Sequence, residues 1–244
     1  MPDPGLLAAG AFTGFLVGLT GVGGGALMTP LLLLLFGVAP VTAVGTDLWF
    51  ASITKLLATR VHHHHDLIDW PVVRRLWAGS LPAAAITLVL MQWFSPGSQS
   101  VVFLKEVIGI AVLVTALGVV MQKYLHGFGR RFRLTEESLF KQLQAPLTVF
   151  SGAVIGTLVA LTSVGAGALG AVLLTYLYPL RLTPPRLIAT DIVHAIPLAM
   201  FAGLGHFFIG YVDFALLGNL LLGSLPAVLL GARLSSRLQH RWLR

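Results

Sequence analysis

Two aspartates lie inside otherwise apolar stretches of the sequence, at corresponding places in its two halves. Asp47 and Asp191 each follow a threonine, Thr46 or Thr190, and their segments AVGTDL and LIATDI align at an offset of 144 residues. A charge inside an apolar segment is costly, so such a carboxylate is by default a functional candidate that faces the protein interior. A carboxylate in this setting can take up and release a proton, which makes Asp47 and Asp191 candidates for proton coupling.

A lysine and a histidine accompany these aspartates at helical spacing. Lys55 follows Asp47 by eight residues, and His194 follows Asp191 by three, while the second half has Ala199 where the first has Lys55. Residues at such spacings share one face of a helix. We expect Lys55 to bind an anionic substrate and His194 to join the aspartates as a proton-coupling candidate. The alternatives are a structural ion pair, an aspartate that caps a helix, or a lysine that reaches the cytoplasmic surface.

Two glycine-rich segments, TGVGGGAL at 20–27 and TSVGAGAL at 162–169, are copies of each other and interrupt hydrophobic stretches. Glycine lets the backbone approach a ligand, and the helix N-terminus that follows offers N–H groups and a partial positive charge. This pattern predicts an anion site, with hydroxyl groups as further donors. The candidate substrate-binding residues are Thr20, Gly21, Gly23, Gly24, Gly25, Thr46, Lys55, Thr162, Ser163, Gly165, Gly167 and Thr190. The alternative is close helix packing, which we assign to Gly14, Gly18, Gly152 and Gly156.

The chain divides into two similar halves. At the offset of 144, 12 of the 41 positions from Ala43 to Ala83 are identical, including the segment GSLPA. Paired, glycine-broken hydrophobic segments in corresponding places are typical of the substrate site of a secondary transporter. We therefore expect a first repeat over residues 1–94, a linking helix and cytoplasmic loop over 95–140, and a second repeat over 141–244.

Hydrophobic segments predict the elements of each repeat. They run over residues 5–19, 26–36, 41–59, 71–94, 101–121, 145–161, 168–178, 185–204 and 214–232. A full membrane span needs about 20 residues, and the second and seventh segments supply only about half of that. The expected fold is an all-α membrane protein with two inverted repeats of about four helical segments each. Each repeat contains a glycine-broken half-helix, and one extra transmembrane helix joins the repeats.

Composition places the chain in a membrane. Hydrophobic residues make up 56% of it and charged residues only 10%, too few for a soluble globule of 244 residues. The net charge of +7 comes from basic residues at the ends of apolar segments, which excludes a nucleic-acid-binding stripe. The chain has no cysteine, and no P-loop or HExxH motif. We expect no enzyme activity, no cofactor, no bound metal and no coupling to its own ATP hydrolysis.

Arginine and lysine predict the orientation. All of them except Lys55 and Lys105 lie in residues 60–75, 123–141, 181–186 and 233–244. Basic connections stay in the cytoplasm, so the N-terminus is expected in the periplasm and the C-terminus in the cytoplasm. The run His62 to His65 is expected to be a solvated cytoplasmic cluster, because consecutive helical side chains point in different directions. Asp69 and Asp213, each followed by an aromatic residue, are expected to be helix N-caps.

The motifs GLTGVGGGALMTP, AVGTDL with the following ITK, and GSLPA resemble those of the TauE/SafE family of sulfite and organosulfonate exporters, from about Gly14 to Ala232. This chain departs from a common pattern in one place, since Asp47 stands where many relatives have serine. The resemblance implies a bacterial inner-membrane transporter of small anions such as sulfite, sulfoacetate or related compounds. We expect export by alternating access, with protons as a candidate coupling ion. The alternatives are an intramembrane metalloenzyme or metal-binding protein, and a metal-cation or solute importer on the same scaffold.

Overall fold

Helices make up most of the part that the computed structural model describes, which is residues 2–20, 25–61, 67–93, 102, 106–110, 113–114, 117, 121, 137–165 and 167–242. The helices are α1 (Pro4–Thr20), α2 (Gly25–Leu34), α3 (Pro40–Val61), α4 (Trp70–Trp93), α6 (Glu137–Thr162), α7 (Ala168–Leu177), α8 (Pro184–Ile209) and α9 (Phe214–Trp242). The described residues between 101 and 121, where the linking helix is expected, are helical as well. Within these ranges the expectation of an all-α fold is confirmed.

Within the residues that the structure describes, four helices are long and apolar enough to cross a membrane, namely Trp70–Trp93, Gln142–Thr162, Pro184–Ile209 and Phe214–Ser235. Large apolar side chains on the outer surface fit the same conclusion. Leu34 is 82% exposed, Phe208 80% and Trp93 78%. A soluble protein rarely leaves so many large apolar side chains in contact with water, whereas a lipid bilayer solvates them. The protein is therefore a membrane protein.

Two helices are too short to span a bilayer. α2 and α7 contain ten residues each, so each is about 15 Å long, roughly half the thickness of the hydrocarbon core. They occupy the second and seventh of the predicted hydrophobic segments, directly after the two glycine-rich segments. The short helices expected from the sequence are thus present.

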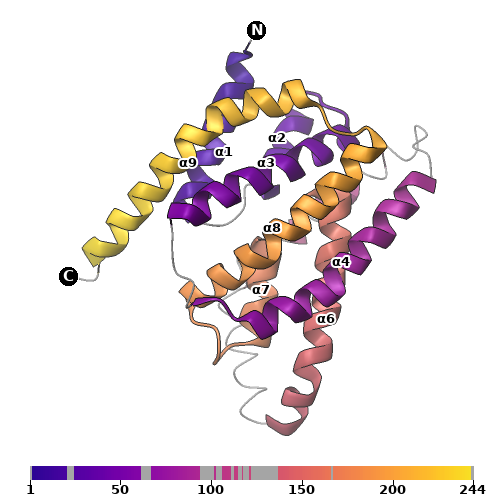
Figure 1. Cartoon of the computed structure of the whole chain (residues 1–244), viewed down its shortest axis with the longest axis vertical. Helices are drawn as coiled ribbons and strands as arrows, with labels where there is room; N and C mark the ends of the chain where they lie inside the picture. Colours follow the sequence, from indigo (N-terminus) through magenta and orange to yellow (C-terminus); the bar gives the residue numbers. More distant parts are fainter. Residues whose placement is uncertain are drawn as a thin grey trace.

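The long helices with described bounds follow one another across the molecule in the order α1, α9, α3, α8, α4 and α6, each packed against the next. Figure 1 shows α9 with α1 on one side, α4 with α6 on the other, and α3 and α8 in the middle. The short α2 packs against α3, and the short α7 packs against α6 and α8. This arrangement places the helices that carry the two intramembrane aspartates, α3 and α8, side by side at the centre.

The two central helices run in opposite directions. Thr46 lies near the start of α3, and its hydroxyl accepts a hydrogen bond of 3.1 Å from the backbone N–H of Asp213, just beyond the end of α8. Thr190 lies near the start of α8, and its hydroxyl accepts a 3.1 Å bond from the backbone N–H of Asp69, just beyond the end of α3. The same contact therefore occurs at both ends of the helix pair, with the two halves of the chain exchanged.

Glycines bring the outer helices into close contact. A Cβ atom added at Gly14 would collide with Ser224 of α9, and one added at Gly156 would collide with Ser80 of α4. Gly18 and Gly152 meet backbone atoms of α9 and α4 in the same way. The packing role predicted for these four glycines is confirmed, and it joins α1 to α9 and α6 to α4.

Candidate functional site

The carboxylate of Asp47 is fully buried at the contact between α3 and α2. Its Oδ2 accepts a 2.6 Å hydrogen bond from the hydroxyl of Thr29, which lies on α2. Its Oδ1 has no hydrogen-bond partner among the described residues. A buried carboxylate oxygen without a hydrogen-bond partner destabilises the folded protein, so a purely structural role does not account for Asp47.

The second glycine-rich segment reaches the same carboxylate from the other half of the chain. Its Ser163 has a φ of 58°, which is uncommon for a residue with a side chain, and Gly165 and Gly167 have φ of 126° and 128°. These conformations turn the chain sharply between α6 and α7 while it stays buried. The Ser163 hydroxyl lies close to Asp47, outside hydrogen-bonding geometry and without another partner among the described residues.

Asp191 is 5% exposed and occupies the matching place on α8. Its Oδ1 lies against the Cα atom of Gly170, on α7, where an added Cβ would collide with it. This oxygen, too, lacks a hydrogen-bond partner within the described parts of the chain. Gly170 therefore makes room for the carboxylate, although the sequence alone gave no reason to select it.

Lys55 lies between the two aspartates. It is 3% exposed and interacts electrostatically with both Asp191 and Asp47. The alternative in which Lys55 reaches the cytoplasmic surface is wrong, because its side chain is enclosed by the protein. The structure thus brings a single ammonium group within electrostatic range of both predicted carboxylates.

His194 is fully buried and faces the same centre, where it interacts electrostatically with Lys55. One ring nitrogen, Nε2, lies 3.0 Å from the hydroxyl of Ser80 on α4, and the other has no partner among the described residues. The indole N–H of Trp77 donates a 3.2 Å hydrogen bond to the His194 carbonyl oxygen. These contacts tie α8 to α4 next to the charged centre.

Other predicted site residues have local partners or lie elsewhere. The hydroxyls of Thr46 and Thr190 accept backbone bonds across the α3 and α8 pair, and that of Thr162 donates a 2.6 Å bond to Leu158 O in its own helix. Thr20 and Gly25 are end residues of α1 and α2. Gly21, Gly23 and Gly24 lie outside the described residues, as does the run His62 to His65.

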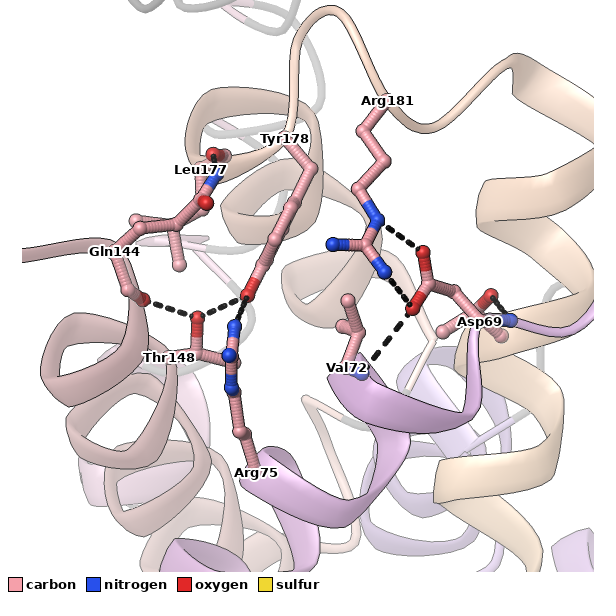
Figure 2. A network of polar contacts seen from close by, with 9 residues as sticks. Asp69, Val72, Arg75, Gln144, Thr148, Leu177, Tyr178 and Arg181 are labelled. Carbon is pink, nitrogen blue, oxygen red and sulfur yellow. Dashed lines mark hydrogen bonds and ion pairs between the residues drawn. The ribbon is translucent and has the colours of Figure 1, made fainter. Parts of the chain in front are cut away.

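A second polar cluster joins the connection between α3 and α4 to the connection between α7 and α8 (Figure 2). Arg181, in the connection between α7 and α8, donates bonds of 2.5 and 2.8 Å to the two carboxylate oxygens of Asp69. Asp69 also caps α4, with Val72 N donating to its Oδ1 at 3.3 Å, as predicted. Beside this pair, the buried hydroxyl of Tyr178 bonds to Arg75 of α4 and to Thr148 of α6.

The described residues contain no group of three or more His, Asp or Glu side chains that could hold a metal ion. Their polar centre consists instead of two carboxylates, one ammonium group and one imidazole inside an apolar helix bundle. This combination is typical of membrane transporters, in which intramembrane ionisable groups mark the path of a solute or proton.

Comparison with known proteins agrees with this class. The sequence matches the family "Sulfite exporter TauE/SafE" over residues 6–244, so the chain belongs to the TauE/SafE family of membrane transporters. It is 38% identical over 238 residues, 97% of this chain and 91% of the relative, to the probable membrane transporter protein YjnA of Bacillus subtilis. It is 25% identical over 224 residues, 91% and 86%, to the probable membrane transporter protein YdhB of the same species. No solved structure matches.

Three residues of the charged centre were not predicted from the sequence. Thr29, Ser80 and Gly170 lie on α2, α4 and α7, and each contacts Asp47, His194 or Asp191 only through the tertiary fold. Thr29 offered one signal, a hydroxyl residue inside a short apolar segment next to a glycine-rich loop. Gly170 and Ser80 offered none, since glycine and serine are common in packed membrane helices.

Proposed function

We propose that this protein is a secondary transporter that exports small anions, such as sulfite, sulfoacetate or related organosulfur and carboxylate anions. One observation carries the proposal. Lys55, a buried cation, interacts electrostatically with two buried carboxylates, and the second glycine-rich segment places the Ser163 hydroxyl close to one of them, Asp47. An anion that enters this centre meets Lys55, the Ser163 hydroxyl and loop N–H groups. The family name supports anions of the sulfite type as the first candidates.

We infer that the two halves are inverted repeats that alternate access to this centre. The halves are residues 1–94 and 141–244, joined by the helix and loop of residues 95–140. The exchanged contacts between Thr46 and Asp213 and between Thr190 and Asp69 support this inference, as does the opposite direction of α3 and α8. Such repeats can rock against each other around a site at their interface, so that it opens to one side at a time.

We place the protein in the bacterial inner membrane, with the N-terminus in the periplasm and the C-terminus in the cytoplasm. The concentration of arginine and lysine in residues 60–75, 123–141, 181–186 and 233–244 supports this orientation. In this frame the ion pair between Asp69 and Arg181 faces the cytoplasm, and the connection between α8 and α9 faces the periplasm.

A thermal-shift screen of the detergent-purified protein tests the proposal. The panel consists of sulfite, thiosulfate, sulfoacetate, taurine and small carboxylates, with chloride at equal ionic strength as the control. We expect at least one anion to raise the melting temperature in a saturable way, since a ligand stabilises the state that binds it. Stabilisation by divalent cations alone would favour a cation importer, and stoichiometric, tightly bound zinc or iron would favour the metal-binding alternative.

A further inference from the structure

As far as the structure describes it, the charged centre contains one cation for two carboxylates. Among the described residues, Lys55 is the only buried lysine or arginine, while Asp47, Asp69 and Asp191 are the buried acids. Asp69 is paired with Arg181, so Asp47 and Asp191 share the single ammonium group. His194 also interacts electrostatically with Lys55, and its Nε2 lies 3.0 Å from the Ser80 hydroxyl.

The register of α3 and α8 explains how one lysine can interact electrostatically with both aspartates. The indole N–H of Trp49 donates a 3.0 Å bond to Gly203 O, so these residues lie at the same level of the antiparallel pair. Counting along both helices from that level places Lys55 about opposite Pro197. Lys55 is then roughly 12 Å along the axis from Asp47 and roughly 9 Å from the level of Asp191, at 1.5 Å per residue. It therefore lies between them along the axis, and the residue that aligns with it in the second half of the sequence is Ala199.

A net charge in such a centre is expensive. An ion removed from water without a partner costs several kcal/mol, so the buried groups are stable only when their charges balance. The ammonium group balances one ionised carboxylate, and the other carboxyl group must then hold a proton. An incoming monovalent anion that pairs with Lys55 leaves the ionised carboxylate without a counter-charge, until that carboxylate also takes up a proton.

We propose that the protein moves monovalent anions together with one proton each, so that a transport cycle carries no net charge. This inference rests on the proposed function and deepens it by naming the charge class of the cargo. A sulfonate, a carboxylate or hydrogen sulfite carries one negative charge, so one added proton restores the charge balance. A dianion needs two added protons, but only one of the two carboxylates can take one up, because the other already holds a proton.

Flux of isethionate, a sulfonate with a single fixed charge, into proteoliposomes tests this inference. We expect a pH gradient to drive uptake, with one proton per anion counted by a trapped pH dye. We expect a diffusion potential of about 100 mV to change isethionate uptake by less than about twofold. A carrier that moved one net charge would instead change accumulation by about 50-fold at that potential. Asp47→Asn and Asp191→Asn should each retain isethionate binding and lose uptake against a concentration gradient.

The outcomes separate the two proposals. Isethionate uptake that follows the membrane potential and moves no protons overturns the one-to-one coupling but leaves anion transport in place. If isethionate, sulfite and sulfoacetate all fail to enter, the proposed function itself is wrong. If sulfoacetate, a dianion, enters as fast as isethionate and with one proton, the selectivity for monovalent anions is wrong, but the rest of the proposal stands.

A different observation, the ion pair at one end of the molecule, carries a second inference. Arg181 and Asp69 link the connections of the two halves, but the matching connection at the other end, residues 35–39, has the sequence LFGVA and offers no cation to Asp213. The aspartate cap itself is present at both ends, since Leu216 N donates to Asp213 Oδ1 at 2.9 Å. Within the described parts of the chain, an ion pair therefore closes this end of the helix pair and no matching pair closes the other.

We infer that the Asp69 and Arg181 pair is a gate that holds this end closed and must separate when the site opens there. Thiol labelling tests this in the cysteine-free chain, with Thr190→Cys beneath the gate and Thr46→Cys as the matched control at the opposite end. Arg181→Gln should accelerate maleimide labelling of the first cysteine at least tenfold and leave the second unchanged. The charge exchange Asp69→Arg with Arg181→Asp should restore slow labelling. Equal acceleration at both cysteines means general loosening and overturns the gate, as does unchanged labelling at both.

Discussion

Replacing Lys55 with methionine is expected to abolish anion binding. Methionine keeps most of the volume of the side chain and removes the only buried lysine or arginine charge among the described residues. Asp47 and Asp191 then lose the ammonium group that interacts with both of them, and an added anion would meet buried carboxylates without a compensating positive charge. We expect at least a 100-fold loss of affinity for the stabilising anion, measured by thermal shift or by isothermal titration.

A matched control separates this local effect from the loss of one positive charge overall. Arg74 is an exposed cation on α4, and Arg74→Met removes the same charge without touching the centre. We expect Arg74→Met to bind the anion as the parent protein does. If Lys55→Met binds equally well, Lys55 is a structural counter-ion of the aspartates and the anion binds elsewhere.

The second large effect is expected from a single methyl group. Gly170→Ala places a Cβ atom where Asp191 Oδ1 lies, so the carboxylate has to move. Flux should fall at least tenfold, because Asp191 loses its place relative to Lys55, while the melting temperature changes by only a few degrees. The initial rate of anion uptake in proteoliposomes is the measurement.

Gly218→Ala is the matched control for this change. Gly218 lies in α9, and an added Cβ there meets no atom within 4 Å. Alanine is also the better helix former, so this variant should be as stable as the parent or slightly more stable, with unchanged flux. Parent-like flux in Gly170→Ala would mean that the position of Asp191 does not matter for transport.

Much of the fold was predictable because the apolar segments are long and their interruptions are distinct. The short helices after the glycine-rich segments, the aspartate caps and the burial of Asp47 and Asp191 all follow from local sequence. The ends of the helices were harder to predict from the sequence. α9 continues to Trp242, ten residues past the predicted Ala232, because its polar end remains helical although it lacks the apolar character of a membrane span.

The candidate site was predictable only in part, because its geometry depends on contacts across the fold. Thr29 contacts Asp47 over 18 residues of sequence, and Arg181 contacts Asp69 over 112. No local pattern encodes such pairs. Asp69 was predicted to cap a helix, which it does, and this local role gave no reason to expect a distant arginine as well.

Anion flux through the purified protein tests the central claim most directly. The measurement is uptake of labelled isethionate, sulfite and sulfoacetate by proteoliposomes that contain the parent protein or the Lys55→Met variant, with protein-free liposomes as the baseline. The account predicts saturable uptake of at least one monovalent anion by the parent and baseline uptake by the variant. Baseline uptake of all three anions by the parent, or equal uptake by parent and variant, would contradict it.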